Sequence, residues 1–288
     1  MKIANTADEA YAHIDHWRRE GQRIGLVPTM GALHQGHLSL ATRSCQECDI
    51  TAVTIFVNPT QFGPHEDFSR YPRTLEQDLK MLQELGVDLV FTPSNERLYP
   101  NGYSTYVSPP DVAKPLEGVF RPGHFRGVAT IVLKLFQILP ANIAYFGQKD
   151  FQQLVVIQRM AEDLNIPIRV VGCPTVRESD GLAMSSRNRY LDPKQRFAAA
   201  SLWKALSAAQ QMLLEGNREV KQLEEVMQQT LYREGAEKIE YARVVDSHWL
   251  TDLTTVDRPA VALIAAYVGS TRLIDNIMLE TSQKQRHS

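Results

Sequence analysis

The chain has 288 residues, 43% of them hydrophobic, and a formal net charge of −2 at pH 7. This composition supports one large or two modest folded domains and offers no basic field for nucleic acid or an anionic membrane. No apolar run approaches the roughly 18 residues that cross a bilayer, and the N-terminal segment lacks the apolar core of a secretory signal. Three cysteines do not indicate a disulfide framework. We therefore expect a cytoplasmic protein that binds neither nucleic acid nor membrane.

The chain opens with a helix signal. Thr6 and Glu9 have the spacing of a capping box, and Ala10, Ile14 and Trp17 fall on one helical face. A helix is therefore expected soon after residue 6.

Strands and helices then alternate. Strands are expected at 24–27, 50–57, 87–91, 144–146 and 168–172, and helices at 36–48, 74–85, 125–139 and 150–163. Leu75, Leu79 and Leu82 are expected on one side of helix 74–85. Alternation of this kind predicts right-handed crossovers and a parallel sheet with helices on both faces, which binds ligands at the carboxyl ends of its strands.

The pattern changes after about residue 180. Residues 193–235 are helix-rich, and strand-like segments follow at 238–245, 260–268 and 272–279. We expect an α/β domain over residues 1–180 and a smaller α+β domain over 181–288, with 181–192 as the connection.

The first chemical motif follows the first strand of the α/β region. His34 and His37 lie three residues apart around Gly36, where a helix is expected to begin. A helix N-terminus offers unpaired N–H groups and a positive dipole end, which keeps both imidazoles neutral donors. Gly31 and Gly36 let the backbone approach a phosphate. The motif favours a triphosphate site over two unremarkable surface or core histidines.

A metal site is the alternative, because Cys45 and Cys48 follow closely. Eight helical residues separate His37 from Cys45, about 12 Å along the axis, which is too far for one tetrahedral site. We expect these cysteines to pack on the helix.

A second motif is Met184-Ser185-Ser186-Arg187. Two hydroxyls and a guanidinium in a glycine-containing loop can bind phosphate oxygens. Alone, the segment is more typical of a polar interdomain loop. It gains meaning beside the histidine motif.

Together the two motifs resemble the signatures of the nucleotidylyltransferase superfamily, shared with class I aminoacyl-tRNA synthetases. Further segments narrow the resemblance to the pantothenate synthetase family: FVNPTQF at 56–62, YPRT at 71–74, FGQKDFQQ at 146–153 and SSRNRYL at 185–191. The resemblance runs from about residue 20 to 195, and the remainder fits in size and order.

The resemblance implies an activity. ATP and pantoate would give pantoyl-adenylate and pyrophosphate, and β-alanine would then displace AMP to give pantothenate. It also implies Mg²⁺, a Rossmann-like N-terminal domain, a smaller C-terminal lid domain and a homodimer.

The resemblance also implies an ATP site. Within it, His37 would donate to the departing pyrophosphate side together with His34, Lys149 would neutralise charge at the α-phosphorus, and Ser185 and Arg187 would close over the triphosphate. The whole implied set is Met30, Gly31, Ala32, Leu33, His34, Gln35, Gly36, His37, Gly147, Gln148, Lys149, Asp150, Val176, Met184, Ser185, Ser186 and Arg187.

Pantoate would be held by the amides of Asn58, Gln61 and Gln153, which both donate and accept and so discriminate hydroxyls. Taken without the resemblance, Asn58 could cap a plain turn, Gln153 could be a solvated helix residue, and Lys149 with Asp150 could be a surface ion pair.

Asp78 is the candidate Mg²⁺ ligand, through water. Some relatives carry an acid at the preceding position, which is Gln77 here, and this departure puts ligation by the protein in doubt. Arg121, in a segment with His124 that also resembles the family, either faces the substrates or belongs to a structural loop.

Two other classes of function stay open. A nucleotidylyltransferase that modifies a phosphate ester would need further cationic residues for the second phosphate. A non-catalytic nucleotide sensor or RNA-binding module could share the fold.

Overall fold

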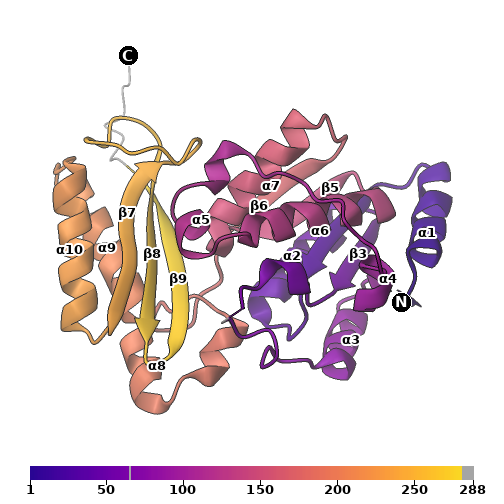
Figure 1. The fold of residues 1–288 in the computed structure, drawn as a ribbon, viewed down its shortest axis with the longest axis horizontal. Coiled ribbons are helices and arrows are strands. Elements are labelled where there is room, and N and C mark those ends of the chain that lie inside the picture. Colours follow the sequence, from indigo (N-terminus) through magenta and orange to yellow (C-terminus); the bar gives the residue numbers. More distant parts are fainter. Residues whose placement is uncertain (65, 281–288) are drawn as a thin grey trace. The chain divides into compact units, whose positions relative to one another are not determined.

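The computed structural model describes residues 1–64 and 66–280. It divides the chain into two compact units, Met1–Val176 and a second that begins at Arg177 (Figure 1). The division into functional domains at residue 180 stays a prediction. Across the described residues, no helix has both the length and the apolar character needed to cross a membrane.

The first unit is an α/β fold. Its strands are β1 Lys2–Ala4, β2 Ile24–Thr29, β3 Ile50–Ile55, β4 Leu89–Phe91, β5 Ile143–Gly147 and β6 Arg169–Cys173. Its helices are α1 Ala7–Arg19, α2 Gln35–Glu47, α3 Leu75–Glu84, α4 Asn95–Leu98, α5 Glu117–Phe120, α6 His124–Ile138 and α7 Phe151–Asp163. Short 3₁₀ turns occur at η1 Pro59–Gln61, η2 Asp111–Ala113 and η3 Gln148–Asp150.

The strands form one parallel sheet in the order β1-β4-β3-β2-β5-β6. From β2 the chain moves outward to β3 and β4, and it later returns to the other side of β2 through β5. The order reverses between β2 and β5, so the loops after these strands lie at the edge where open parallel sheets bind ligands.

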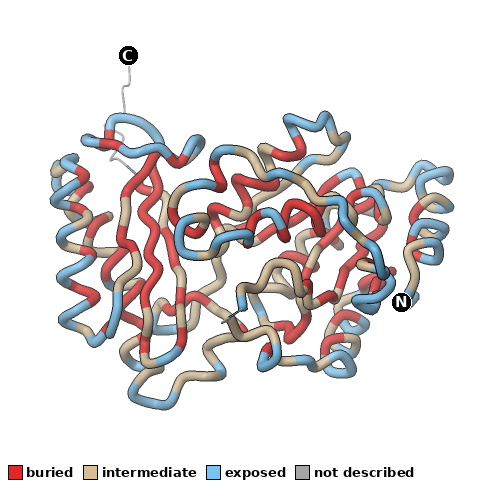
Figure 2. Tube along the Cα trace, in the orientation of Figure 1, coloured by how far each residue is buried: buried red, intermediate tan, exposed pale blue. Residues whose placement is uncertain are grey.

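Helices cover both faces of the sheet, as expected. On one face Leu40 of α2 and Leu82 of α3 share a core with Val53 of β3. On the other face Phe136 of α6 meets Phe146 of β5 edge to face, with ring centroids 6.5 Å apart. Figure 2 shows buried residues concentrated along the strands of this unit.

Local sequence signals have mixed outcomes. The capping box of Thr6 and Glu9 is confirmed at the start of α1. Strand β1, which pairs with β4, was not expected, because three residues are too few to show a periodicity. Leu75, expected on one side of helix α3 with Leu79 and Leu82, is 44% exposed, whereas Leu82 is buried. Helix α3 turns Asp78 inward instead, one turn before Leu82.

The second unit confirms the expected α+β fold. It contains η4 Ser186–Tyr190, α8 Pro193–Ala199, α9 Ser201–Leu214, α10 Val220–Arg233, β7 Lys238–Asp246, β8 Ala260–Val268 and β9 Thr271–Leu279. The strands form an antiparallel sheet in the order β7-β8-β9. Leu206 of α9 and Leu223 of α10 share its core with Val244 and Ile264.

Candidate active site

The two histidines cap helix α2 reciprocally. His34 is the N-cap, and its Nδ1 accepts the N–H of Gly36 at 3.1 Å. The N–H of His34 donates in turn to Nδ1 of His37 at 3.4 Å. The ring centroids are 4.1 Å apart. Because backbone donors occupy both Nδ1 atoms, each neutral ring carries its proton on Nε2.

The surroundings keep His37 neutral. Burial, followed by the neighbouring His34, lowers the pKa of His37 from 6.5 to about 3. Asp150 and Lys149 are close enough to add smaller opposing effects on this pKa. At neutral pH His37 is therefore an uncharged N–H donor.

A buried carboxylate shapes the loop between β2 and α2. Gly31 and Ala32 have left-handed backbones, with φ of 79° and 49°. Asp78 Oδ2 accepts the N–H of Ala32 at 2.8 Å, and Oδ1 accepts the N–H of Leu33 at 2.9 Å and the hydroxyl of Thr74 at 3.0 Å. Since Asp78 is 1% exposed, these bonds are made away from water. The carboxylate thus stabilises a turn that only glycine adopts readily.

The loop after β5 lies beside this turn, because β2 and β5 are paired neighbours. Lys149 Nζ lies 3.3 Å from Asp150 Oδ1 within η3. A Cβ added to Gly147 would meet no atom within 4 Å, so the backbone there borders open space. The structure therefore brings Gly147, Lys149 and Asp150 together with the histidine turn.

The loop after β3 carries two of the expected amides. Asn58 is 1% exposed, and its Oδ1 accepts the hydroxyls of Thr60 and Tyr99, each at 2.9 Å. Its Nδ2 donates to Gln61 Oε1 at 3.1 Å and to the carbonyl of Gly127 at 3.3 Å. The amide of Asn58 is therefore engaged within the protein, and one of its bonds orients Gln61.

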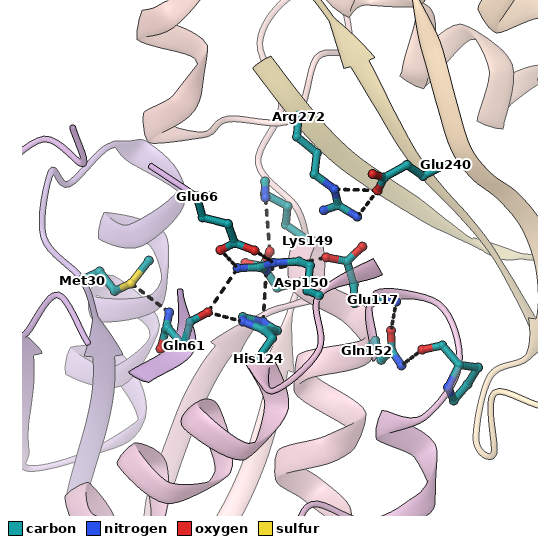
Figure 3. A network of polar contacts seen from close by, with 12 residues as sticks. Met30, Gln61, Glu66, Glu117, His124, Lys149, Asp150, Gln152, Glu240 and Arg272 are labelled. Atoms are coloured by element: carbon teal, nitrogen blue, oxygen red, sulfur yellow. Dashed lines mark hydrogen bonds and ion pairs between the residues drawn. The ribbon is translucent and has the colours of Figure 1, made fainter. Parts of the chain in front are cut away.

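Gln61 joins this loop to the turn between β2 and α2. Its Nε2 lies 3.0 Å from Met30 Sδ, as Figure 3 shows. A thioether is a weak acceptor, so a ligand oxygen can replace it at little cost.

His124, labelled in Figure 3, contacts the main chain of the same loop, and Arg121 contacts both that loop and His124. His124 Nδ1 lies 2.9 Å from the carbonyl oxygen of Gln61, and Arg121 Nη1 lies 3.2 Å from His124 Nε2. Arg121 also makes two bonds of 2.7 Å to Glu66. From the sequence, Arg121 could either contact the substrates or belong to a structural loop. Its contacts here favour the structural role.

The third expected amide, Gln153, is half-buried on α7. Its neighbour Gln152, which the sequence did not single out, is the buried one. The amide of Gln152 accepts the N–H of Glu117 and donates to the carbonyls of Val112 and Pro115. Gln152 therefore holds the segment before α6. The sequence did contain a signal for this role, because Gln152 is a polar residue on the apolar face of helix α7.

The second motif lies in the second unit. Ser185 caps η4, and its Oγ accepts the N–H of Arg187 at 3.3 Å. Ser186 is buried, and Met184 and Arg187 are half-buried. Val176, the last residue of the first unit, is also half-buried.

The cysteines of α2 pack as expected. Cys48 Sγ lies 3.4 Å from the hydroxyl of Tyr145, and Cys45 Sγ lies 4.0 Å from the carbonyl of Leu85. Within residues 1–64 and 66–280, no three side chains of His, Cys, Asp or Glu are grouped as metal ligands.

Comparisons with known proteins agree over nearly the whole chain. A family model described as pantoate-beta-alanine ligase matches residues 2–278. The pantothenate synthetase of Thermotoga petrophila is 49% identical over 279 residues, 97% of this chain and 100% of that protein. The crystal structure of pantothenate synthetase from Thermus thermophilus has a TM-score of 0.92 and 42% identity, covering 97% of this chain and 99% of that one.

A further solved structure is pantoate-beta-alanine ligase from Francisella tularensis, complexed with beta-gamma ATP and beta-alanine. It has a TM-score of 0.79 and 36% identity, covering 98% of this chain and 99% of that one. The resemblance first seen in the sequence motifs is confirmed, and the chain belongs to the pantoate–β-alanine ligase family.

Proposed function

We propose that this protein condenses pantoate with β-alanine in an ATP-dependent reaction that passes through pantoyl-adenylate. A pantoate carboxylate oxygen attacks the α-phosphorus of ATP, and the bond to the β-phosphate breaks to release pyrophosphate. The amine of β-alanine then attacks the acyl carbon, loses a proton, and displaces AMP. Family membership and the ATP and β-alanine bound to the Francisella relative support this reaction.

The observation that carries the proposal is the pair of neutral imidazoles at the carboxyl edge of the sheet. With Nδ1 of each ring bonded to backbone, the Nε2–H groups serve as donors to phosphate oxygens. We assign His37 to the departing pyrophosphate, His34 to the phosphates, and Lys149 to the charge that builds at the α-phosphorus. Donors fixed before the reaction stabilise such charge without reorganisation. No protein nucleophile is required.

The two loops beside these rings complete the nucleotide site. The backbone of 30–33 and residues 35–36 would follow the phosphates, and the open space over Gly147 suits the ribose or adenine. Gln148 and Asp150 would contact the nucleoside. Phosphate contacts by Met184, Ser185, Ser186 and Arg187, a contact by Val176, and a lid role for 181–288 remain proposals from the resemblance.

For pantoate we assign Gln61 and Gln153 as the hydrogen-bonding amides. Asn58 was expected beside them, but its amide is consumed by bonds within the protein. We therefore propose that Asn58 acts by orienting Gln61 through the 3.1 Å bond to its Oε1.

Asp78 suits the role of a Mg²⁺ ligand less well than the sequence suggested. Both oxygens of Asp78 accept protein hydrogen bonds, and the carboxylate is almost fully buried. These oxygens are not available as ligands to a hydrated ion. We propose that Asp78 shapes the turn between β2 and α2, and that any Mg²⁺ is bound by the phosphates of ATP and keeps several waters.

A cytoplasmic location and a homodimer are also proposed. Free Cys45, Cys48 and Cys173 suit a reducing compartment. The homodimer follows from the family resemblance alone.

The test follows the fate of ATP in the presence of Mg²⁺. We expect exchange of labelled pyrophosphate into ATP with pantoate alone, and AMP release that requires pantoate and β-alanine together. Formation of ADP, or transfer of a nucleotide to a phosphate ester, would refute the ligase. Binding of ATP without any turnover would indicate a nucleotide sensor.

A further inference from the structure

The backbone carbonyl oxygen of Gln61 accepts hydrogen bonds from two side chains outside its own turn. His124 Nδ1 lies 2.9 Å from this oxygen, and Arg121 Nη2 lies 3.4 Å from it. His124 is only 8% exposed, so its bond is shielded from water. These contacts hold the main chain of the residue whose side chain meets Met30 (Figure 3).

The contacts fix the state of His124. A carbonyl oxygen can only accept, so the ring proton lies on Nδ1, and Nε2 accepts from Arg121 at 3.2 Å. Arg121 is held in turn by two bonds to Glu66 and by Glu117 at 3.6 Å. The guanidinium of Arg121 thus donates to the neutral imidazole of His124, which donates in turn to the carbonyl oxygen of Gln61.

The turn that carries Gln61 needs outside support. Helix η1 has only three residues, and the N–H of Gln61 reaches the carbonyl of Asn58 at a long 3.5 Å. Helix α6 packs directly against this turn, because a Cβ on Gly127 would come within 2.2 Å of the carbonyl oxygen of Thr60. The first turn of α6 is therefore the platform on which Gln61 rests.

We propose that His124, held by Arg121 and Glu66, is a positioning residue that fixes Gln61 for recognition of the hydroxylated acid. This rests on the assignment of Gln61 to pantoate. A recognising amide must be held to within a fraction of an ångström of its bonding position, and its supporting contacts determine how well it is held. His124 touches no reacting atom in this scheme and acts only through Gln61.

Variants of His124 test the relay in the full-length protein. His124→Leu removes the donor, and we expect the KM for pantoate to rise about tenfold, as for loss of an ordering hydrogen bond. The KM values for ATP and β-alanine should stay within about twofold. His124→Asn restores a donor near the position of Nδ1, so it should recover most of the loss.

A matched control lies on the same helix. Thr130 is also buried, and its hydroxyl accepts the N–H of Val107 and donates to the carbonyl of Arg126. Thr130→Val should lower stability without a selective effect on pantoate. If it raises the pantoate KM as His124→Leu does, general loosening of α6 explains both results and the proposal is overturned.

A double mutant separates this proposal from the function on which it rests. With Gln61→Ala present, His124→Leu should have little further effect on the pantoate KM, because both changes remove one interaction. Additive losses would overturn the relay. A Gln61→Ala variant with unchanged pantoate KM would instead refute the pantoate site itself.

A milder variant covers the case in which His124→Leu does not fold. Glu66→Gln weakens the grip on Arg121 from a half-buried position, and we expect a pantoate KM raised about threefold. An unchanged pantoate KM in that variant would overturn the relay.

Discussion

Asp78→Asn tests whether Asp78 is a structural carboxylate that supports the turn between β2 and α2 or a metal ligand. The substitution keeps the shape of the side chain but leaves one acceptor oxygen where two are used. The new NH₂ group would face the N–H of Ala32 or Leu33 across distances of 2.8 or 2.9 Å. A donor would thus oppose a donor in a site sealed from water.

The cost follows from these contacts. A hydrogen bond to a charged group contributes about 1.5–3 kcal/mol, and an unpaired buried donor adds a penalty of similar size. The left-handed backbone of Ala32 costs about 1–2 kcal/mol with either side chain at position 78, so it adds nothing to the difference. We expect the free energy of unfolding to fall by roughly 2–4 kcal/mol, with the upper end relieved by rearrangement of the turn.

Two measurements separate the interpretations. Urea unfolding should show the stability loss, and the KM for ATP should rise on the order of tenfold because the displaced turn leads into His34. Thr74→Val is the matched control, since it removes only the hydroxyl bond to Asp78 and should cost about 1 kcal/mol. If Asp78→Asn leaves stability unchanged and excess Mg²⁺ restores its activity, Asp78 binds the ion and our reasoning is wrong.

Three further predictions follow from the site. His37→Ala should lower kcat on the order of 10²-fold, as for loss of a transition-state donor, while loss of its capping bond to His34 lowers the free energy of unfolding by only about 1 kcal/mol; near-normal turnover would remove His37 from its proposed role. Gly147→Val should leave the fold intact, because φ of −74° suits any residue and space is open, yet raise the KM for ATP at least several-fold; an unchanged value would place the nucleotide elsewhere. Burial, followed by the charge of Arg121, lowers the pKa of His124 from 6.5 to about 4. As pH falls, the unfolded state therefore takes up the proton before the folded state does. The free energy of unfolding should fall between pH 6.5 and 4, by roughly 3 kcal/mol in total. Urea titrations at several pH values should show a shallower fall in His124→Asn, and equal slopes would contradict this assignment.

The regular elements of the first unit were predictable because their signals are local. A strand such as β3 is a run of branched apolar residues, and the switch between periods of two and 3.6 marks each helix. Strand β1 escaped because it has only three residues and depends on pairing with β4, far along the chain. The histidine turn was predictable for the same local reason, since its capping contacts span three residues.

The supporting residues of the site were not predictable in this way. Asp78 meets Ala32 across 46 positions, and His124 meets Gln61 across 63. Neither pairing leaves a pattern in a single sequence. A weak signal existed for Asp78, which lies one turn before Leu82 on a face that is otherwise apolar. A carboxylate there implies an unseen partner, because burial without one is costly.

The same construction recurs at two loops of the sheet edge. Asp78 of α3 hydrogen-bonds to the backbone of the turn after β2, and His124 of α6 hydrogen-bonds to the backbone of the turn after β3. In each case a buried polar group satisfies the backbone, which leaves side chains such as His37 and Gln61 available for the substrate contacts that we propose. A reaction without a protein nucleophile depends on placing two substrates and stabilising charge at the phosphates. The specificity of such a site therefore resides as much in the residues behind the loops as in those that face the ligand.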